Sequence, residues 1–298
     1  MNVGLIGLGK MGIAIASRLL KAKFNVIAFD PNNLAQDEAK ILGVQIAPNI
    51  SEVAQKTRII WLMVPAGKIV DVALEELRPH LRSKDIIIDG GNSKFSDSMV
   101  RGAQLSEEGV YFIDCGTSGG IHGREIGFSL MIGGDQTAYR EAEPIFKAIA
   151  APGGYGYMGP SGTGHYVKMI HNGIEYALLQ AYAQGFHLLK FGRFGHLNLE
   201  EISRVWINGS IIRSWILELA HEVFKKDQDF KNITGEVEHT GMGAWMIEEA
   251  QQQKIPATLI EESLNIRKES QKTGGNYATK IVAMLRNAFG GHAIKQKK

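Results

Sequence analysis

The sequence predicts an α/β protein in which a doubly wound parallel sheet is followed by an all-helical C-terminal domain. Over residues 1–160, short apolar runs such as "NVGLIGLG", "NVIAFD", "RIIWLMVP" and "DIIIDGG" alternate with helical patterns such as "GIAIASRLLKAK". This alternation is typical of βαβ units, which build a largely parallel sheet covered by helices. After Gly159 the strand-like runs disappear and helical periodicity dominates. We therefore expect two domains, residues 1–160 and residues 161–298.

The composition is that of a globular protein with ordinary cores. The 298 residues are 44% hydrophobic and 21% charged, and 33 basic against 31 acidic side chains leave a net charge of +2. This balance gives no field that would direct the protein to nucleic acid. No apolar run reaches the roughly 18 residues of a membrane span, and the glycine-rich start lacks the basic segment of a signal peptide. The single cysteine, Cys115, fits a reducing cytoplasm.

A glycine-rich motif lies directly between the first expected strand and the first expected helix. It has the pattern G-x-G-x-x-G and consists of Gly7, Leu8, Gly9, Lys10, Met11 and Gly12. Glycine at these places permits a tight turn and lets the backbone approach a pyrophosphate at the N-terminus of the helix. A turn that binds nothing is the alternative, and the strand–turn–helix context argues against it. The motif predicts a Rossmann-type dinucleotide site.

Asp30 indicates which dinucleotide this site prefers. It ends the second expected strand, 18 residues beyond Gly12. A carboxylate there accepts hydrogen bonds from a free ribose 2′-hydroxyl and repels a 2′-phosphate. The following "PNN" offers no basic side chain to neutralise such a phosphate. We therefore predict NAD as the cofactor, with NADP disfavoured.

Three further strand ends carry polar or glycine-rich loops, "MVPAG", "DGGNS" and "CGTSGG". Ligands of open parallel sheets bind at the carboxyl ends of the strands. We predict that the cofactor contacts Met63, Val64, Pro65 and Asn92, and that Asn92 also contacts substrate. The segment Ser118, Gly119 and Gly120 offers a hydroxyl and closely spaced N–H groups, which suit a carboxylate. For each glycine pair, an ordinary turn is the alternative.

An apolar helical segment, "GHYVKMIHNGIEYALLQ" (residues 164–180), carries one polar face. Its members at i, i+3, i+4 and i+7 are Lys168, His171, Asn172 and Glu175. Beside a nicotinamide, an alcohol that loses hydride needs a base for its hydroxyl proton, and a buried lysine serves if its pKa falls from about 10.4 toward about 7–8. Glu175, in an apolar pocket, would be the matching acid. A buried Lys–Glu ion pair in a helical core is the alternative.

The motif around Lys168 resembles the signature helix of the decarboxylating 6-phosphogluconate dehydrogenase family. The segments "DGGNS", "GTSGG", "SLMIGG" and "RNAFGGH" are also similar to that family, and the resemblance extends from residue 1 to about 292. The length is similar to the short form of the family. The resemblance implies oxidative decarboxylation of 6-phosphogluconate to ribulose 5-phosphate and CO2 with hydride transfer to NAD. Lys168 would be the base and Glu175 the acid that protonates the enediol.

The resemblance also implies the substrate contacts. They are Asn92, Ser118, Gly119, Gly120, Lys168, His171, Asn172, Glu175, Tyr176, Arg267, Arg286 and His292. The last four of these would bind the phosphate. By family likeness Arg286 and His292 come from the tail of a partner subunit, so a homodimer or tetramer would complete each site. The resemblance implies no metal.

The sequence departs from the family's long form at two places near the expected substrate site. Thr240 stands where the long form commonly has a lysine for the phosphate, so His239 would substitute or the site would be weaker. Ile121 and His122 stand where the long form has acidic residues.

Two other functions are compatible with a dinucleotide domain. A β-hydroxyacid dehydrogenase would oxidise a small 3-hydroxy acid without phosphate, and it would have no use for Arg267, Arg286 and His292. A protein that binds NAD without turnover would have no reason to keep Lys168 and Glu175.

Overall fold

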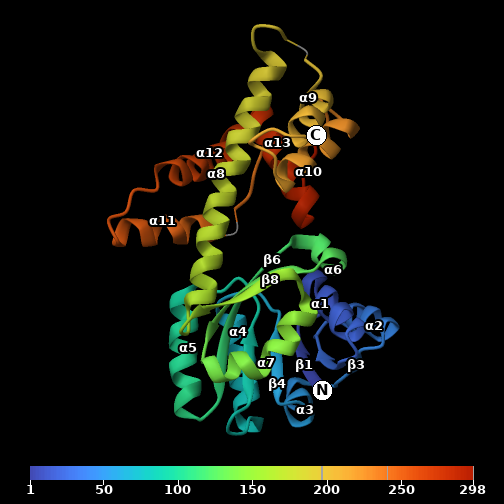
Figure 1. Cartoon of the computed structure of the whole chain (residues 1–298), viewed down its shortest axis with the longest axis vertical. Helices are drawn as coiled ribbons and strands as arrows, with labels where there is room; N and C mark the ends of the chain where they lie inside the picture. The colour runs from blue at the N-terminus through green and yellow to red at the C-terminus, as the bar shows by residue number, and fades with distance from the viewer. Residues whose placement is uncertain (196, 240, 298) are drawn as a thin grey trace. The chain divides into compact units, whose positions relative to one another are not determined.

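The computed structural model describes residues 1–195, 197–239 and 241–297. The chain divides into two compact units, Met1–Lys168 and Met169–Lys298. The division falls inside α8 (Thr163–Phe191), an uninterrupted helix that contributes residues to both units (Figure 1). The sequence-based boundary at residues 160 and 161 lies just ahead of this helix. Among the helices in the described ranges, none combines the length and apolar character that crossing a membrane requires.

The first unit is built on an eight-stranded sheet with the order β3-β2-β1-β4-β5-β6-β7-β8. The strands from β3 to β6 are parallel, β7 runs antiparallel to β6, and β8 is parallel to β7. Because the strand order reverses beside β1, a ligand crevice is expected at the carboxyl ends of β1 and β4. The strands are β1 (Asn2–Ile6), β2 (Asn25–Phe29), β3 (Gln45–Ile46), β4 (Ile59–Leu62), β5 (Ile86–Asp89), β6 (Tyr111–Ser118), β7 (Phe128–Gly134) and β8 (Ala150–Gly159).

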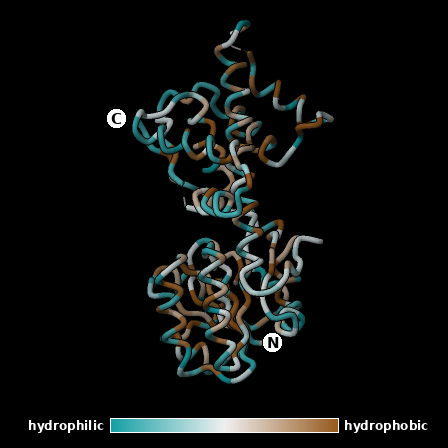
Figure 2. The backbone as a smooth tube through the Cα atoms, turned by 90° about the vertical axis from the view of Figure 1, so that its left-hand side faces the viewer, coloured by the Kyte–Doolittle hydropathy of each residue, from teal (hydrophilic) through white to brown (hydrophobic). Residues whose placement is uncertain are grey.

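Helices cover both faces of this sheet, which confirms the predicted doubly wound fold. They are α1 (Lys10–Lys21), α2 (Asn33–Leu42), α3 (Ile50–Lys56), α4 (Lys68–Leu77), α5 (Phe95–Glu107), α6 (Gly123–Ile126) and α7 (Gln136–Ile149), with short 3₁₀ turns η1 (Arg78–His80) and η2 (Gly120–His122). Figure 2 shows the hydrophobic backbone segments of this unit concentrated in its interior.

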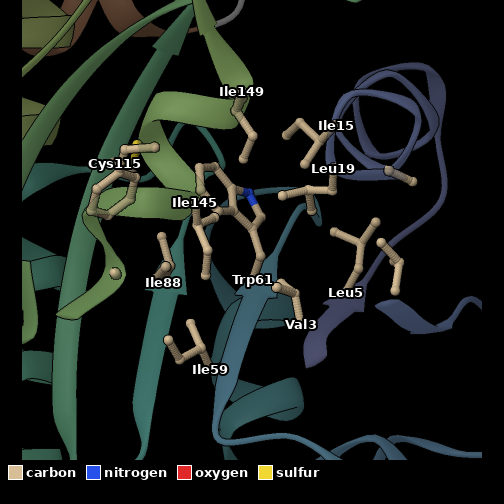
Figure 3. Packing of buried hydrophobic residues seen from close by; sticks show 14 of the residues in the cluster. Val3, Leu5, Ile15, Leu19, Ile59, Trp61, Ile88, Cys115, Ile145 and Ile149 are labelled. Carbon is tan, nitrogen blue, oxygen red and sulfur yellow. The ribbon is translucent and has the colours of Figure 1, made fainter. Parts of the chain in front are cut away.

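Neighbouring residues of one strand pack on opposite faces, because side chains alternate along a strand. On β4, Trp61 is fully buried among side chains that include Ile15 of α1 and Ile149 of α7 (Figure 3). The next residue, Leu62, belongs to the cluster on the other face, which includes Val70 of α4. The sheet is therefore sealed on both sides, and its strand ends supply the polar groups.

Two strands were not predicted from the sequence. β3 has two residues, which is too short for a periodic pattern, and β8 has the glycine-rich sequence "AAPGGYGYMG". β8 forms because β7 offers it a hydrogen-bonding edge, with Leu130 opposite Tyr155 and Ile132 opposite Tyr157. Its strand conformation is thus set by a neighbour and not by local propensity.

The second unit is helical, as predicted. Besides the greater part of α8 it contains α9 (Leu199–Ile207), α10 (Trp215–Lys226), α11 (Met242–Gln252), α12 (Thr258–Thr273) and α13 (Tyr277–Gly290). Its core includes Phe186 of α8, Phe224 of α10 and Leu285 of α13. Asn276 begins α13 with a reciprocal capping box to Thr279, which satisfies backbone N–H groups at the helix start.

Candidate active site

The glycine-rich turn provides a cradle for an anion at the start of α1. Gly7 has φ of +98°, and a Cβ there would lie 2.8 Å from the carbonyl carbon of Met63. A Cβ on Gly9, by contrast, would meet no atom within 4 Å. Gly9 is the N-cap of α1, no side chain caps the helix, and its first turn has no acidic residue. The first N–H groups of α1 are therefore not capped by a side chain and suit a dinucleotide pyrophosphate.

Asp30 holds this turn from the end of β2. Its Oδ2 accepts a hydrogen bond of 2.6 Å from the Leu8 N–H, and its Oδ1 accepts one of 2.8 Å from the Asn32 N–H. Each carboxylate oxygen keeps acceptor capacity for a ribose hydroxyl. The negative charge beside the glycine turn opposes a 2′-phosphate, which agrees with the preference for NAD.

A buried carboxylate shapes the loop that carries Asn92. Asp89, fully buried at the end of β5, accepts hydrogen bonds from the Gly91 N–H at 3.0 Å and the Ser93 hydroxyl at 2.6 Å. Asn92 is exposed at the tip of this turn. The loop after β4 lies against it, because a Cβ on Gly91 would be 3.0 Å from the Val64 carbonyl oxygen. The strands thus place Met63, Val64 and Pro65 beside the turn of Asn92.

A second buried carboxylate fixes the start of α8. Asp114 on β6 accepts hydrogen bonds from the N–H groups of Gly162, at 2.7 Å, and His165, at 2.8 Å. The His165 Nδ1 lies 2.7 Å from the hydroxyl of Ser98 on α5. All three side chains are nearly or fully inaccessible to solvent. This end of α8 is therefore held to both β6 and α5.

Lys168 lies one turn further along α8 and is 5% exposed. Its aliphatic stem lies on Gly116 of β6, where an added Cβ would be 3.0 Å from Lys168 Cγ. Ser118 ends the same strand, and Gly119 follows it with φ of +131°, which a residue with a side chain rarely adopts. Gly120 then begins η2. The first unit thus brings Lys168 and β6 together, with the Ser118–Gly120 turn at the carboxyl end of that strand.

The remaining polar residues of the predicted stripe continue along α8 in the second unit. His171, Asn172 and Glu175 are all half-buried, and the His171 Nδ1 lies 3.0 Å from the Asn172 Oδ1. Because α8 is uninterrupted from Thr163 to Phe191, these side chains share one helix face with Lys168.

A cluster of cations surrounds Tyr176 in the second unit. Arg267 of α12 is 1% exposed, and its guanidinium carbon lies 3.4 Å from the centroid of the Tyr176 ring. Neither terminal nitrogen of Arg267, nor the Tyr176 hydroxyl, has a hydrogen-bond partner among the described residues. Burial lowers the pKa of Arg267 to about 10, so the guanidinium is charged at neutral pH. Buried donors without partners are costly, and a bound anion would satisfy them.

Arg286 of α13 belongs to the same cluster. It is 6% exposed, burial lowers its pKa, and its charge contributes to the lowered pKa of Arg267. One chain therefore assembles both arginines, whereas the family resemblance assigns Arg286 to a partner's tail. The partner's contribution of Arg286 and His292 stays a prediction. His292 follows α13 and lies edge-on to Phe289, with ring centroids 6.2 Å apart.

His239 faces the same cations. Burial lowers its pKa, and the charges of Lys268, Arg267 and Arg286 lower it further. The His239 Nδ1 is buried without a partner among the described residues. The neighbouring departure from the family pattern, Thr240, lies outside the described residues. Ile121 is exposed in η2, beside the Ser118–Gly120 turn.

Sequence reasoning missed the residues that position this site. Asp89, Ser98, Arg101 and Asp114 contact no expected ligand, and each holds a loop or helix that carries predicted site residues. A signal was available for two of them, because Asp89 and Asp114 each stand at the end of a run of buried apolar strand residues.

Comparison with known proteins decides the family. A family model described as the NAD binding domain of 6-phosphogluconate dehydrogenase matches residues 2–166. A second, described as the C-terminal domain of 6-phosphogluconate dehydrogenase, matches residues 164–296. The chain belongs to the 6-phosphogluconate dehydrogenase family. This result confirms the resemblance that the motif around Lys168 indicated.

Individual 6-phosphogluconate dehydrogenases agree with this assignment. A Haloferax volcanii protein named "6-phosphogluconate dehydrogenase, NAD(+)-dependent, decarboxylating" is 44% identical over 302 residues, which cover 100% of this chain and 99% of the relative. Plasmodium falciparum 6-phosphogluconate dehydrogenase, solved in its apo form and in complex with its cofactor NADP+ and its substrate 6-phosphogluconate, matches with a TM-score of 0.83 and 29% identity, over 92% of this chain and 62% of that one. A 3-hydroxyisobutyrate dehydrogenase from Salmonella typhimurium has a TM-score of 0.79 at 19% identity, over 95% of this chain and 99% of that one, and shows the fold alone.

Proposed function

We propose that this chain catalyses the oxidative decarboxylation of 6-phosphogluconate to ribulose 5-phosphate and CO2, with NAD as the hydride acceptor. The observation that carries the proposal is the buried Lys168, held against β6 at the start of α8, in a chain 44% identical over its whole length to an NAD-dependent enzyme of that name. This reaction is a step of the pentose phosphate pathway and of gluconate utilization.

NAD, when bound at the glycine turn, supplies the acceptor for the hydride that leaves C3 of the substrate. Lys168 takes the proton of the C3 hydroxyl, so that the carbon that loses hydride becomes a ketone. Its small exposed fraction keeps water from competing for that proton. The product of this step is a β-keto acid.

Decarboxylation breaks the C1–C2 bond, and the electron pair moves toward the C3 oxygen as CO2 leaves. Lys168, now protonated, returns its proton to that oxygen and gives an enediol. Glu175 donates a proton to the carbon that lost CO2, while Lys168 takes the hydroxyl proton again, which yields the ketose. The two side chains suit this pair of roles because they are two turns apart on one helix face.

The cation cluster around Tyr176 provides recognition of the phosphate. Arg267 and Arg286 carry two buried positive charges, and the Arg267 terminal nitrogens and the Tyr176 hydroxyl are donors in need of an acceptor. A phosphate dianion offers that acceptor and charge-assisted bonds. His292, of this chain or of a partner, is the fourth proposed contact. Asn92, His171 and Asn172 would bind substrate hydroxyls, and the Ser118–Gly120 turn the carboxylate.

A β-hydroxyacid dehydrogenase acting on an unphosphorylated substrate fits the structure less well. Such a substrate would offer no acceptor to the buried terminal nitrogens of Arg267, and an unsatisfied buried donor costs about 1–3 kcal/mol. The shared fold does not discriminate between the two reactions, whereas this cluster does.

We also infer that the protein is a cytoplasmic homodimer or a dimer of dimers. The second unit exposes several large apolar side chains on the last turns of α8 and in the segments that follow α8 and α9. They are Leu188, Phe191, Phe194, Ile211 and Ile212, with Ile211 fully exposed. A second copy of the chain would bury them. The single cysteine, fully buried, suits a reducing compartment.

The direct test is nicotinamide reduction by the purified protein with 6-phosphogluconate, run in parallel with NAD and NADP. We expect reduced nicotinamide and CO2 in equal amounts, and faster turnover with NAD. Gluconate is the matched control, because it lacks only the phosphate. Equal rates with gluconate would contradict the role of the cation cluster, and turnover restricted to small 3-hydroxy acids would contradict the proposed reaction.

A further inference from the structure

Arg101 is a buried cation in the first unit that the proposed chemistry does not use. It lies on α5 and is 4% exposed. A charged side chain is rarely buried to this extent unless it is paired. Its partners therefore indicate what it does.

Three different segments converge on the Arg101 guanidinium. Its Nε donates to Asp71 Oδ1 of α4 at 2.8 Å, one terminal nitrogen donates to the Gly67 carbonyl oxygen at 3.2 Å, and the other lies 3.8 Å from Asp89 Oδ2. Gly67 ends the loop after β4, and Asp89 holds the turn of Asn92. One side chain thus connects the two loops in which the NAD contacts are proposed.

The Gly67 carbonyl is a sensitive point of attachment. Gly67 is the N-cap of α4 with φ of +81°, and no side chain caps that helix. The Gly67 carbonyl accepts hydrogen bonds from the Val70 N–H at 3.0 Å and from Arg101, so Arg101 supplies the side-chain contact that holds the end of the 63–67 loop. Across from it, the Gly91 backbone lies against the Val64 carbonyl.

We propose that Arg101 is a positioning residue that fixes the 63–67 loop against the turn of Asn92 and so shapes the NAD site. The inference rests on the proposed function, because it assigns NAD to these loops. Arg101 acts through the Gly67 carbonyl and Asp71, and it contacts neither cofactor nor substrate. Its planar fork is needed, because a lysine ammonium would not donate to Asp71 and to the Gly67 carbonyl in the same fixed directions while its charge faces Asp89.

The test compares two arginine-to-lysine changes between the same pair of helices. Arg101→Lys keeps the charge and loses the fork. Arg78→Lys is the matched control, because Arg78 follows α4 at the end opposite Gly67, donates to Gln104 of α5 at 3.2 Å and pairs with Glu108 at 3.4 Å. Isothermal titration with NAD, steady-state kinetics and thermal unfolding are measured for both variants.

We expect Arg101→Lys to raise the NAD dissociation constant and the KM for NAD about tenfold, with kcat and the KM for 6-phosphogluconate within about twofold. Arg78→Lys should leave NAD binding within about twofold. If Arg101→Lys does not fold, Asp71→Asn serves instead, because the Asp71 side chain is 51% exposed, and we expect it to weaken NAD binding about threefold.

Each outcome has a distinct meaning. The inference is overturned if Arg101→Lys binds NAD with unchanged affinity or, where that variant does not fold, if Asp71→Asn does. It is also overturned if Arg78→Lys loses as much NAD affinity, because the effect would then be a general loosening of α4 and α5. A wild-type chain that binds no NAD would overturn the proposed function together with this inference.

Discussion

The most direct test of the catalytic geometry is to change Gly116, which takes no part in the reaction itself. A Cβ added there would lie 2.8 Å from the Gly164 carbonyl oxygen and 3.0 Å from Lys168 Cγ, and closer still to Lys168 Cβ. Ordinary contact begins at 3.4 Å. To reach ordinary contact with the Gly164 carbonyl alone, the groups have to separate by 0.6 Å, the difference between 3.4 and 2.8 Å. Because the Gly164 carbonyl oxygen and Lys168 Cβ cannot be moved aside by a rotamer change, α8 and β6 have to move apart.

The size of the effect follows from this shift. Overpacking of this kind costs about 1–3 kcal/mol of stability. A misplacement of about 1 Å in a catalytic group costs on the order of 100-fold in rate, and this displacement approaches that value. We therefore expect Gly116→Ala to lower kcat by about 10- to 100-fold. The glycine turn is on other strands, so NAD binding should change by less than about threefold.

The assay is NAD reduction at saturating 6-phosphogluconate, with NAD affinity measured separately by titration calorimetry. Gly185→Ala is the matched control, because Gly185 lies on the same helix and a Cβ there would meet nothing within 4 Å. It should retain full activity and gain up to about 1 kcal/mol from helix propensity. Wild-type kcat in Gly116→Ala would refute the claim that the contact with β6 sets the position of Lys168.

Three further predictions concern the base, the cofactor and the phosphate. Lys168→Met should lower kcat at least about 1,000-fold and leave the NAD dissociation constant within about twofold; equal loss of both would refute the general base. Asp30→Asn combined with Pro31→Arg should raise the ratio of kcat/KM for NADP to kcat/KM for NAD about 100-fold. Asp30→Ala combined with the same arginine should instead lose activity with both cofactors, because the Leu8 N–H loses its acceptor. Burial and neighbouring cations lower the pKa of His239 from its ordinary value of 6.5, and a phosphate dianion favours its charged form, so the KM for 6-phosphogluconate should rise as the pH increases and His239 loses its proton. His239→Gln should flatten that rise, and identical profiles would exclude His239 from the phosphate site.

The first unit was largely predictable from its sequence because its strands carry their own signal. Runs such as "RIIWLMVP" are apolar on both faces, and both faces of the sheet are covered. The sequence does not predict β8, whose pairing with β7 depends on an edge that exists only once the sheet has formed. The full length of β6 was not predictable for the same reason. Its last residues, Gly116 to Ser118, have a loop-like sequence but form strand because they pair with β7.

The candidate site was predictable where chemistry needs a particular residue type at a particular spacing. The glycine turn and the stripe of α8 meet that condition. The positioning residues do not, because their partners are distant in sequence. Asp114 holds backbone groups 48 and 51 residues away, and Arg101 reaches 34 residues back to Gly67. Only the fold brings these groups together, so the sequence does not show which partners Asp114 and Arg101 hold.

The hydrogen bonding of buried charged groups differs between the positioning residues and the proposed phosphate contact Arg267. Asp89 and Asp114 are fully buried, and each accepts two hydrogen bonds from the protein. These carboxylates therefore hold loops and helices in place. Arg267 is as deeply buried, yet both of its terminal nitrogens lack partners among the described residues. Folding alone would not retain a buried cation in that state, because an unpaired buried donor costs stability. The unsatisfied nitrogens of Arg267 therefore support the proposed phosphate site, whereas Asp89 and Asp114 act by positioning the chain.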